Sequence, residues 1–157
     1  MKLLLLLSLV FFIGCTGDNA AVKAKRSADT PRLQYLERVR KLQSEHTFPK
    51  SESESVWGRA QTWITRYSTM KIQTVSDYVI ETFNVTPATN GDLWAGAIPF
   101  AYSVTREPST DGVKITVKCR TDIRAAPDYI REVSDNERML VDYLITGRVD
   151  YPELIAQ

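Results

Sequence analysis

The chain has little of the residue types that build metal and thiol sites. Among its 157 residues there are one histidine, His46, and two cysteines, Cys15 and Cys119. Zinc sites in proteins use three or four ligands, mostly histidine and cysteine. The sequence also has no glycine-rich phosphate loop, no H-E-x-x-H, no C-x-x-C and no G-x-S-x-G. These absences argue against nucleotide-binding, zinc-dependent and serine-hydrolase classes, and we expect no cofactor and no metal.

An excess of charge of one sign is missing as well. The chain has 20 Lys and Arg and 19 Asp and Glu, and of these only Lys2 lies among the first 14 residues. Residues 15–157 therefore carry 20 − 1 = 19 basic and 19 acidic side chains, a balance of zero. A balanced chain has no electrostatic basis for binding nucleic acid, and we expect no nucleic-acid partner.

Long hydrophobic runs are limited to one, at the start of the chain. It extends from Leu3 to Ile13 after the basic Lys2, with Ser8 as its only polar residue. A positive charge followed by such a run is typical of a secretory signal peptide. The run is too short to span a bilayer comfortably, because spanning needs about 20 apolar residues. The sequence therefore predicts a segment that is removed.

The end of this run resembles the lipobox of bacterial lipoproteins. It reads Phe12-Ile13-Gly14-Cys15, with Phe12 where Leu is usual. The resemblance implies that residues 1–14 are a signal peptide and that Cys15 carries the lipid which holds the chain on a membrane. Thr16, rather than Asp, follows the cysteine, which by the same resemblance favours the outer membrane of a Gram-negative envelope. The alternative is an ordinary secreted protein cleaved after Gly17.

Lipidation of Cys15 would leave Cys119 as a single cysteine, because a thioether sulfur cannot form a disulfide. In the stretch 113–120, Cys119 alternates with polar residues and shares a face with Val113, Ile115 and Val117. We predict that it is a buried small hydrophobic residue rather than a reactive thiol.

After cleavage, the remaining length is enough for one domain. Residues 15–29 lack aromatic residues and any apolar period, so they are predicted to be the lipidated cysteine and a flexible tether. Residues 30–157 are predicted to form a single α+β domain, with an extra N-terminal helix at about 31–44 that starts at Thr30-Pro31.

Two further helices are predicted from capping boxes and apolar periodicity. The first, at about 52–67, follows Ser51–Glu54 and carries an aromatic stripe that belongs in a core. The second begins at Ser134, with Glu137 completing a capping box, and ends at Gly147. Between the first two helices, 46–49 is predicted to be a short extended piece because Pro49 biases Phe48 away from helix.

Four strands follow from period-two patterns at 71–75, 78–83, 98–105 and 113–120, joined by short turns. They predict a four-stranded antiparallel sheet whose apolar face packs against helices. Over about residues 46–146, this order of elements resembles helix-grip and TBP-like domains of envelope lipoproteins, including accessory lipoproteins of outer-membrane assembly. The resemblance implies a sheet wrapped on a helix, with room for a ligand between them.

Few residues qualify as functional. His46 is the only base that a Ser-His-Asp hydrolase could use, and an exposed connector residue is the favoured interpretation. Asp122 and Asp128 could form an acid–base pair, but they lie in a turn-rich stretch where Asp is common for local hydrogen bonding. We predict no catalytic residue and no enzyme. Trp94, among small residues at 90–97, is a candidate partner contact, and the alternative is that it caps the core.

Three functions remain open from the sequence. The favoured one is an envelope interaction or scaffold module, anchored to the membrane through Cys15 and binding an envelope protein. The second is a module that binds a small apolar or amphipathic ligand between the sheet and the helix at 134–146. The third is an envelope hydrolase built around His46 or the two aspartates.

Overall fold

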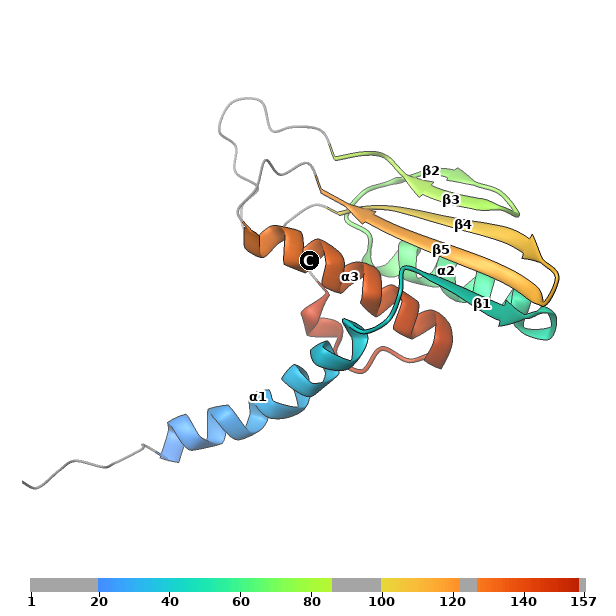
Figure 1. The fold of residues 1–157 in the computed structure, drawn as a ribbon. Helices are drawn as coiled ribbons and strands as arrows, with labels where there is room; N and C mark the ends of the chain where they lie inside the picture. Colours follow the sequence, from blue (N-terminus) through green and yellow to red (C-terminus); the bar gives the residue numbers. More distant parts are fainter. Residues whose placement is uncertain (1–19, 86–99, 122–126, 156–157) are drawn as a thin grey trace, which may run out of the picture.

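The chain folds into an antiparallel sheet with helices on one of its faces (Figure 1). The computed structural model describes residues 20–85, 100–121 and 127–155, with side chains at 30–85, 100–121 and 130–155. The helices are α1 (Ala20–Val39), α2 (Ser53–Tyr67) and α3 (Pro127–Thr146), and the strands are β1 (Glu45–Pro49), β2 (Ile72–Val75), β3 (Val79–Thr82), β4 (Ala101–Ser109) and β5 (Gly112–Arg120). Two short 3-10 turns lie at Lys50–Glu52 and Pro152–Leu154. The predicted α+β class is confirmed.

The sheet has five strands in the order β1-β5-β4-β3-β2, and every neighbouring pair is antiparallel. The predicted meander of four strands is therefore present, but the prediction of a four-stranded sheet was wrong. The extra strand is β1, the piece expected to be merely extended, which places Phe48 opposite Val113. An edge strand pairs on one side only, so it tolerates Pro49, which has no N–H to donate.

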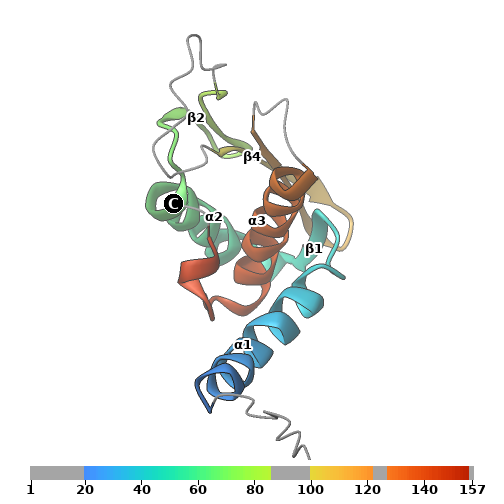
Figure 2. The same ribbon diagram turned by 90° about the vertical axis from the view of Figure 1, so that its left-hand side faces the viewer.

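The predicted alternation of faces on β4 and β5 is confirmed. Along β5 and between Tyr102 and Val104 of β4, every second residue is buried, namely Tyr102, Val104, Val113, Ile115, Val117 and Cys119. Elsewhere on β4 the pattern is less regular, because Arg106 is only partly buried and Ala101, on the other face, is 3% exposed. The residues between the buried ones, such as Ser103 and Lys118, lie on the outer face of the sheet. The core therefore sits between the sheet and the layer formed by α2 and α3 (Figure 2).

Helix α2 begins and ends close to the predicted bounds, and its aromatic stripe is in the core as expected. Trp57 and Trp63 are 5% and 1% exposed. The predicted capping box is absent, because Glu52 at the N-cap makes no side-chain capping bond. A 3-10 turn at Lys50–Glu52 leads into the helix instead.

Helix α3 begins at Pro127, not at Ser134, so the second predicted capping box was also wrong. Glu137 has a different role: its Oε2 accepts a hydrogen bond from the backbone N–H of Cys119 at 3.1 Å and so joins α3 to the end of β5. The predicted end of the helix is confirmed. Gly147 adopts φ +70°, and its N–H donates to the carbonyl of Tyr143 at 2.8 Å.

Helix α1 differs most from expectation. It begins at Ala20 and ends at Val39 rather than covering 31–44, and Pro31 lies inside it. Residues 20–29, predicted to be tether, are therefore helical. They are rich in Ala, Lys and Arg, which favour helix, and Pro31 removes only one N–H from the hydrogen-bond ladder. The N-terminal half of α1 projects away from the sheet and the other helices (Figure 1).

Candidate functional site

The C-terminal half of α1 is fastened to the domain by apolar contacts. Tyr35 and Val39 are 6% and 0% exposed and belong to the core. The ring of Tyr35 lies 5.1 Å from the ring of Tyr151, centroid to centroid, which ties the helix to the C-terminal segment as well. Burial, followed by the negative charge of Asp142, raises the pKa of Tyr35 above its ordinary value. This hydroxyl therefore stays protonated at physiological pH.

Two arginine–aspartate pairs fix the same junction between α1 and α3. Both terminal nitrogens of Arg38 donate to the carboxylate of Asp142, at 2.5 and 3.1 Å. Arg40 donates to Asp135 through Nε and Nη2, at 2.7 and 2.5 Å. The Asp142 side chain is only 2% exposed. Its hydrogen bond with Arg38 raises the pKa of the guanidinium. Bidentate pairs of this kind fix orientation as well as distance.

The junction gives the projecting part of α1 a defined direction. Residues 20–29 extend the helix beyond the docked half by about 15 Å, at 1.5 Å per residue. Figure 2 shows α1 running out from the side of the molecule that α3 occupies. Within the described residues, no helix combines the length and apolarity needed to cross a bilayer.

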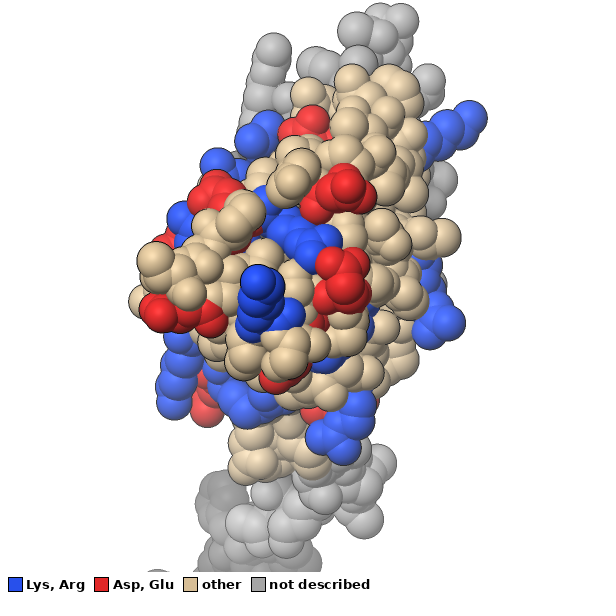
Figure 3. All heavy atoms as spheres, turned by 90° about the vertical axis from the view of Figure 1, so that its right-hand side faces the viewer, with Lys and Arg blue, Asp and Glu red and all other residues tan. Residues whose placement is uncertain are grey.

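A groove of about 640 Å³ lies at the other end of the molecule, where the β4–β5 hairpin turns. It is lined by Lys50, Ser53, Glu54, Asp77, Tyr78, Arg106 and residues 108–113. Figure 3 views this end and shows basic and acidic side chains intermixed around a hollow. The volume is in the range of ligand sites, about 300–1,000 Å³, but such sites are mostly apolar. The charged lining of this groove therefore differs from that of a typical small-molecule site.

Arg106 is the fixed element of this groove. Its Nη2 donates to Ser53 Oγ at 2.6 Å and to the carboxylate of Glu54, both in the first turn of α2. Its guanidinium carbon also lies 5.7 Å from the centre of the Trp57 ring. Beside it Tyr78, 59% exposed, presents an aromatic ring to solvent. The groove thus combines one immobilised cation with one exposed aromatic side chain.

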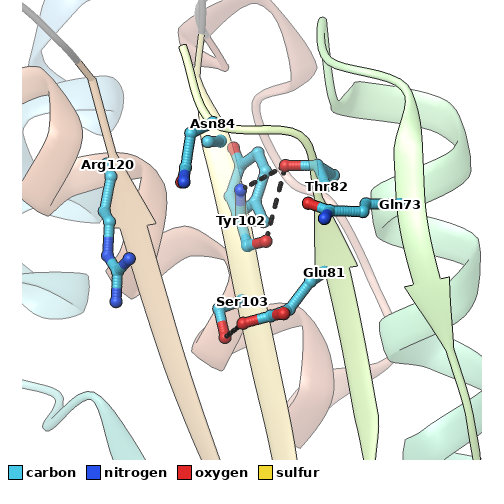
Figure 4. A pocket seen from close by; sticks show the side chains of 8 residues that line it. Gln73, Glu81, Thr82, Asn84, Tyr102, Ser103 and Arg120 are labelled. Atoms are coloured by element: carbon cyan, nitrogen blue, oxygen red, sulfur yellow. Dashed lines mark hydrogen bonds between the residues drawn. The ribbon is translucent and has the colours of Figure 1, made fainter.

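A second, smaller hollow of about 60 Å³ lies on the outer face of the sheet (Figure 4). Its lining is polar and includes Gln73, Glu81, Asn84, Ser103 and Arg120. Ser103 Oγ donates to Glu81 Oε1 at 3.1 Å, so that carboxylate already has one protein donor. A space of this size holds a few water molecules, since one needs about 10–15 Å³ of such volume.

Cys119 behaves as predicted: it is a free cysteine, 7% exposed, among core residues. Burial, followed by the nearby negative charge of Glu137, raises the pKa of its thiol above the ordinary value. The protonated thiol is a poor nucleophile. A catalytic or redox role for Cys119 therefore has no support in this geometry.

Comparisons with protein-family models, with curated proteins and with solved structures find no match.

The residues singled out in the sequence have different outcomes. Cys15, Trp94 and Asp122 lie outside the described residues, and Asp128 falls in the first turn of α3. His46 is exposed on β1, with its ring edge-on to Phe48 at 4.7 Å between centroids. Within the described ranges, no group of three or more His, Cys, Asp or Glu side chains is placed to hold a metal ion.

Sequence reasoning missed the junction between α1 and α3. Arg38 and Arg40 are not among the residues that the sequence singles out, although each pairs with an aspartate of α3. One signal was present. Asp142 is an acidic residue inside the apolar stripe of Met139, Leu140 and Leu144, and a buried carboxylate requires a cationic partner.

Proposed function

We propose that this chain is a bacterial envelope lipoprotein, anchored through lipid on Cys15, whose α+β domain is an interaction or scaffold module. The proposal keeps the helix-grip or TBP-like layout as the expected relationship of the domain. The outer membrane is the expected location, on the basis of Thr16. The binding partner is a protein of the envelope.

The observation that carries the proposal is the attachment of α1. Only four residues, 16–19, separate Cys15 from the start of the helix. At most about 3.5 Å per residue, that segment is short compared with the roughly 30 Å length of α1 itself. Because Arg38 and Arg40 hold the helix on α3, a lipid at Cys15 would restrict both the distance and the orientation of the domain. A scaffold that presents one surface requires such restriction.

The surface that we assign to the partner is the groove beside Arg106. It lies at the end of the molecule away from the start of α1 (Figure 1). Its charges of both signs and the exposed ring of Tyr78 suit a polar protein surface, with the tyrosine as the aromatic anchor. Trp94 remains a second proposed contact. Both described hollows are lined mainly by polar residues, so they do not favour the apolar-ligand alternative.

The test uses the full chain in bacterial cells. A photo-reactive amino acid replaces Tyr78 in the groove or, as a matched control, Lys118, which is exposed on the outer face of the sheet. We expect a discrete crosslinked partner from position 78 and not from 118. We expect a chain in which an ordinary cleavable secretory signal replaces residues 1–15 to leave the membrane and to lower that crosslink. The same products from both positions, or full membrane retention of this chain after its signal is cleaved, would contradict the proposal.

A further inference from the structure

The two edges of the sheet are protected against strand pairing to different degrees. The β1 edge has the sequence Glu45-His46-Thr47-Phe48-Pro49, which contains a charge and a proline. Both features are common devices against edge-to-edge association. The β2 edge reads Ile72-Gln73-Thr74-Val75 and has no charged residue and no proline. All four β2 side chains are exposed, and β2 is the last strand of the sheet. Within the described part of the chain, no strand pairs with its outer backbone edge.

A bulge gives β2 an unusual arrangement of faces. Ile72 pairs with Thr82, and Val75 pairs with Ile80. Both β3 partners are buried and alternate along β3 with Glu81, which bonds Ser103 on the outer face, so we place Ile72 and Val75 on the helix side of the sheet. Thr74 pairs with Glu81 on the outer side. Gln73 lines the outer hollow (Figure 4). Because the register shifts between Ile72 and Thr74, the four side chains of β2 do not alternate. Those of Ile72 and Val75 lie on the helix side, and those of Gln73 and Thr74 lie on the outer side.

This order of faces is the same when β2 is followed from either end, as antiparallel pairing of β2 with a second copy of itself requires. In an antiparallel pair, residues directly opposite each other must lie on the same face. A regular strand alternates, so residues three positions apart could not be partners across a two-fold axis. In β2, Ile72 of one copy can lie opposite Val75 of a second copy, and Gln73 opposite Thr74, with every side chain on a matching face.

Opposite charges flank β2. When Ile72 lies opposite Val75 of the second copy, Lys71 lies opposite Ser76 and diagonal to Asp77 of that copy, within reach of its long side chain, and symmetry repeats the contact. The two exposed aliphatic side chains, 40% and 53% exposed in the single chain, cover each other. We propose that β2 pairs with β2 of a second copy of this chain, joining two five-stranded sheets into one antiparallel sheet of ten strands.

The geometry of such a pair agrees with attachment of both copies to one membrane. The two-fold axis of an antiparallel edge pair is perpendicular to the sheet, so the helix layers of both copies lie on the same side of the joint sheet. Both α1 helices then also emerge on that side (Figure 1). The pairing does not depend on the lipid anchor. Anchoring would strengthen it, since confinement to a surface raises the effective concentration of a short, weak interface.

The test detects the contact between Lys71 and Asp77 of different copies. Full chain from normal medium and from ¹⁵N medium is mixed in detergent and treated with a zero-length carbodiimide, which joins amines to carboxylates. Crosslinked peptides are then sorted by isotope. We expect mixed-isotope Lys71–Asp77 peptides in the wild type and about a tenfold lower yield in Val75→Lys, because two new charges would meet the edge of the neighbouring copy. Thr47→Lys, on the β1 edge, is the matched control and should keep the wild-type yield.

Three results would overturn the pairing. They are no mixed-isotope peptide in the wild type, equal yields in Val75→Lys and Thr47→Lys, or Lys71 joined only to another protein. Circular dichroism establishes that each variant is folded, and Thr74→Lys replaces Val75→Lys if the latter is not. Repeating the experiment with Cys15→Ala, at higher protein concentration, separates the two proposals. Pairing that persists there is independent of the anchor, and failure of the anchor would leave it intact.

Discussion

The ion pair between Arg38 and Asp142 predicts an asymmetric response to substitution. Arg38→Leu would leave a carboxylate that is 2% exposed without its bidentate partner. Removing one member of a buried pair costs about 3–5 kcal/mol, because the remaining charge stays desolvated. The Arg38 side chain itself is 49% exposed, so water already screens part of the interaction. We therefore expect the lower end, about 3 kcal/mol of the free energy of unfolding.

Asp142→Asn should cost less, although it breaks the same pair. The charge left behind is the Arg38 guanidinium, which is half exposed and can be hydrated where it stands. The loss is then that of charge-assisted hydrogen bonds, about 1–2 kcal/mol. Arg40→Leu is the matched control on the same helix. Its partner Asp135 has a side chain that is 12% exposed rather than 2%, so the carboxylate left behind retains more water.

Urea denaturation of the Cys15→Ala chain, followed by circular dichroism, measures these differences. Hydrogen exchange of the α1 amides shows whether the helix detaches before the domain unfolds. We expect Arg38→Leu to be the most destabilised of the three variants and to lose protection in α1 first. Equal costs for Arg38→Leu and Asp142→Asn, or a cost below about 1 kcal/mol for Arg38→Leu, would refute the argument that a desolvated carboxylate holds the junction.

Three further predictions concern the stability of the domain. Because the pKa of the Cys119 thiol is raised, the folded chain keeps a proton that the unfolded chain loses above a pH of about 8.5. The free energy of unfolding should therefore fall as pH rises beyond that value, and Cys119→Ala should make this fall less steep. Gly112→Ala should cost at least about 3 kcal/mol in urea denaturation, because φ is +152° there and a Cβ would overlap the carbonyl oxygen of Phe48; a cost below about 1 kcal/mol would contradict this. Thr82→Val removes the hydroxyl that accepts from the backbone N–H of Tyr102 at 2.8 Å and should cost about 1–3 kcal/mol, whereas an unchanged midpoint would show that this N–H finds another acceptor.

The fold was predictable where local pattern and tertiary environment agree. On β5, apolar and polar residues such as Val117 and Lys118 alternate strictly, which predicts a sheet with one buried face, and the structure has such a sheet. On α2, apolar residues at helical spacing report one buried side, including Trp63. In both cases a residue's surroundings follow from its neighbours in the sequence.

Prediction failed where partners are distant or where several signals compete. β1 forms a strand because it pairs with the edge of β5, and the sequence of its five residues does not indicate that partner. At α1, Thr30-Pro31 is a good helix start, but the helix-favouring residues before it carry the helix through the proline. Arg38 and Asp142 are 104 positions apart, so no local pattern could link them.

The central claim is that a lipid on Cys15 and a docked α1 together hold the domain at a membrane. Intact-mass spectrometry of the chain extracted from bacterial membranes in detergent tests it most directly. We predict a polypeptide that begins at Cys15 and carries the added mass of a diacylglyceryl group, with or without an N-acyl chain. A polypeptide that retains residues 1–14, or an unmodified one that begins at Asp18, would contradict the account.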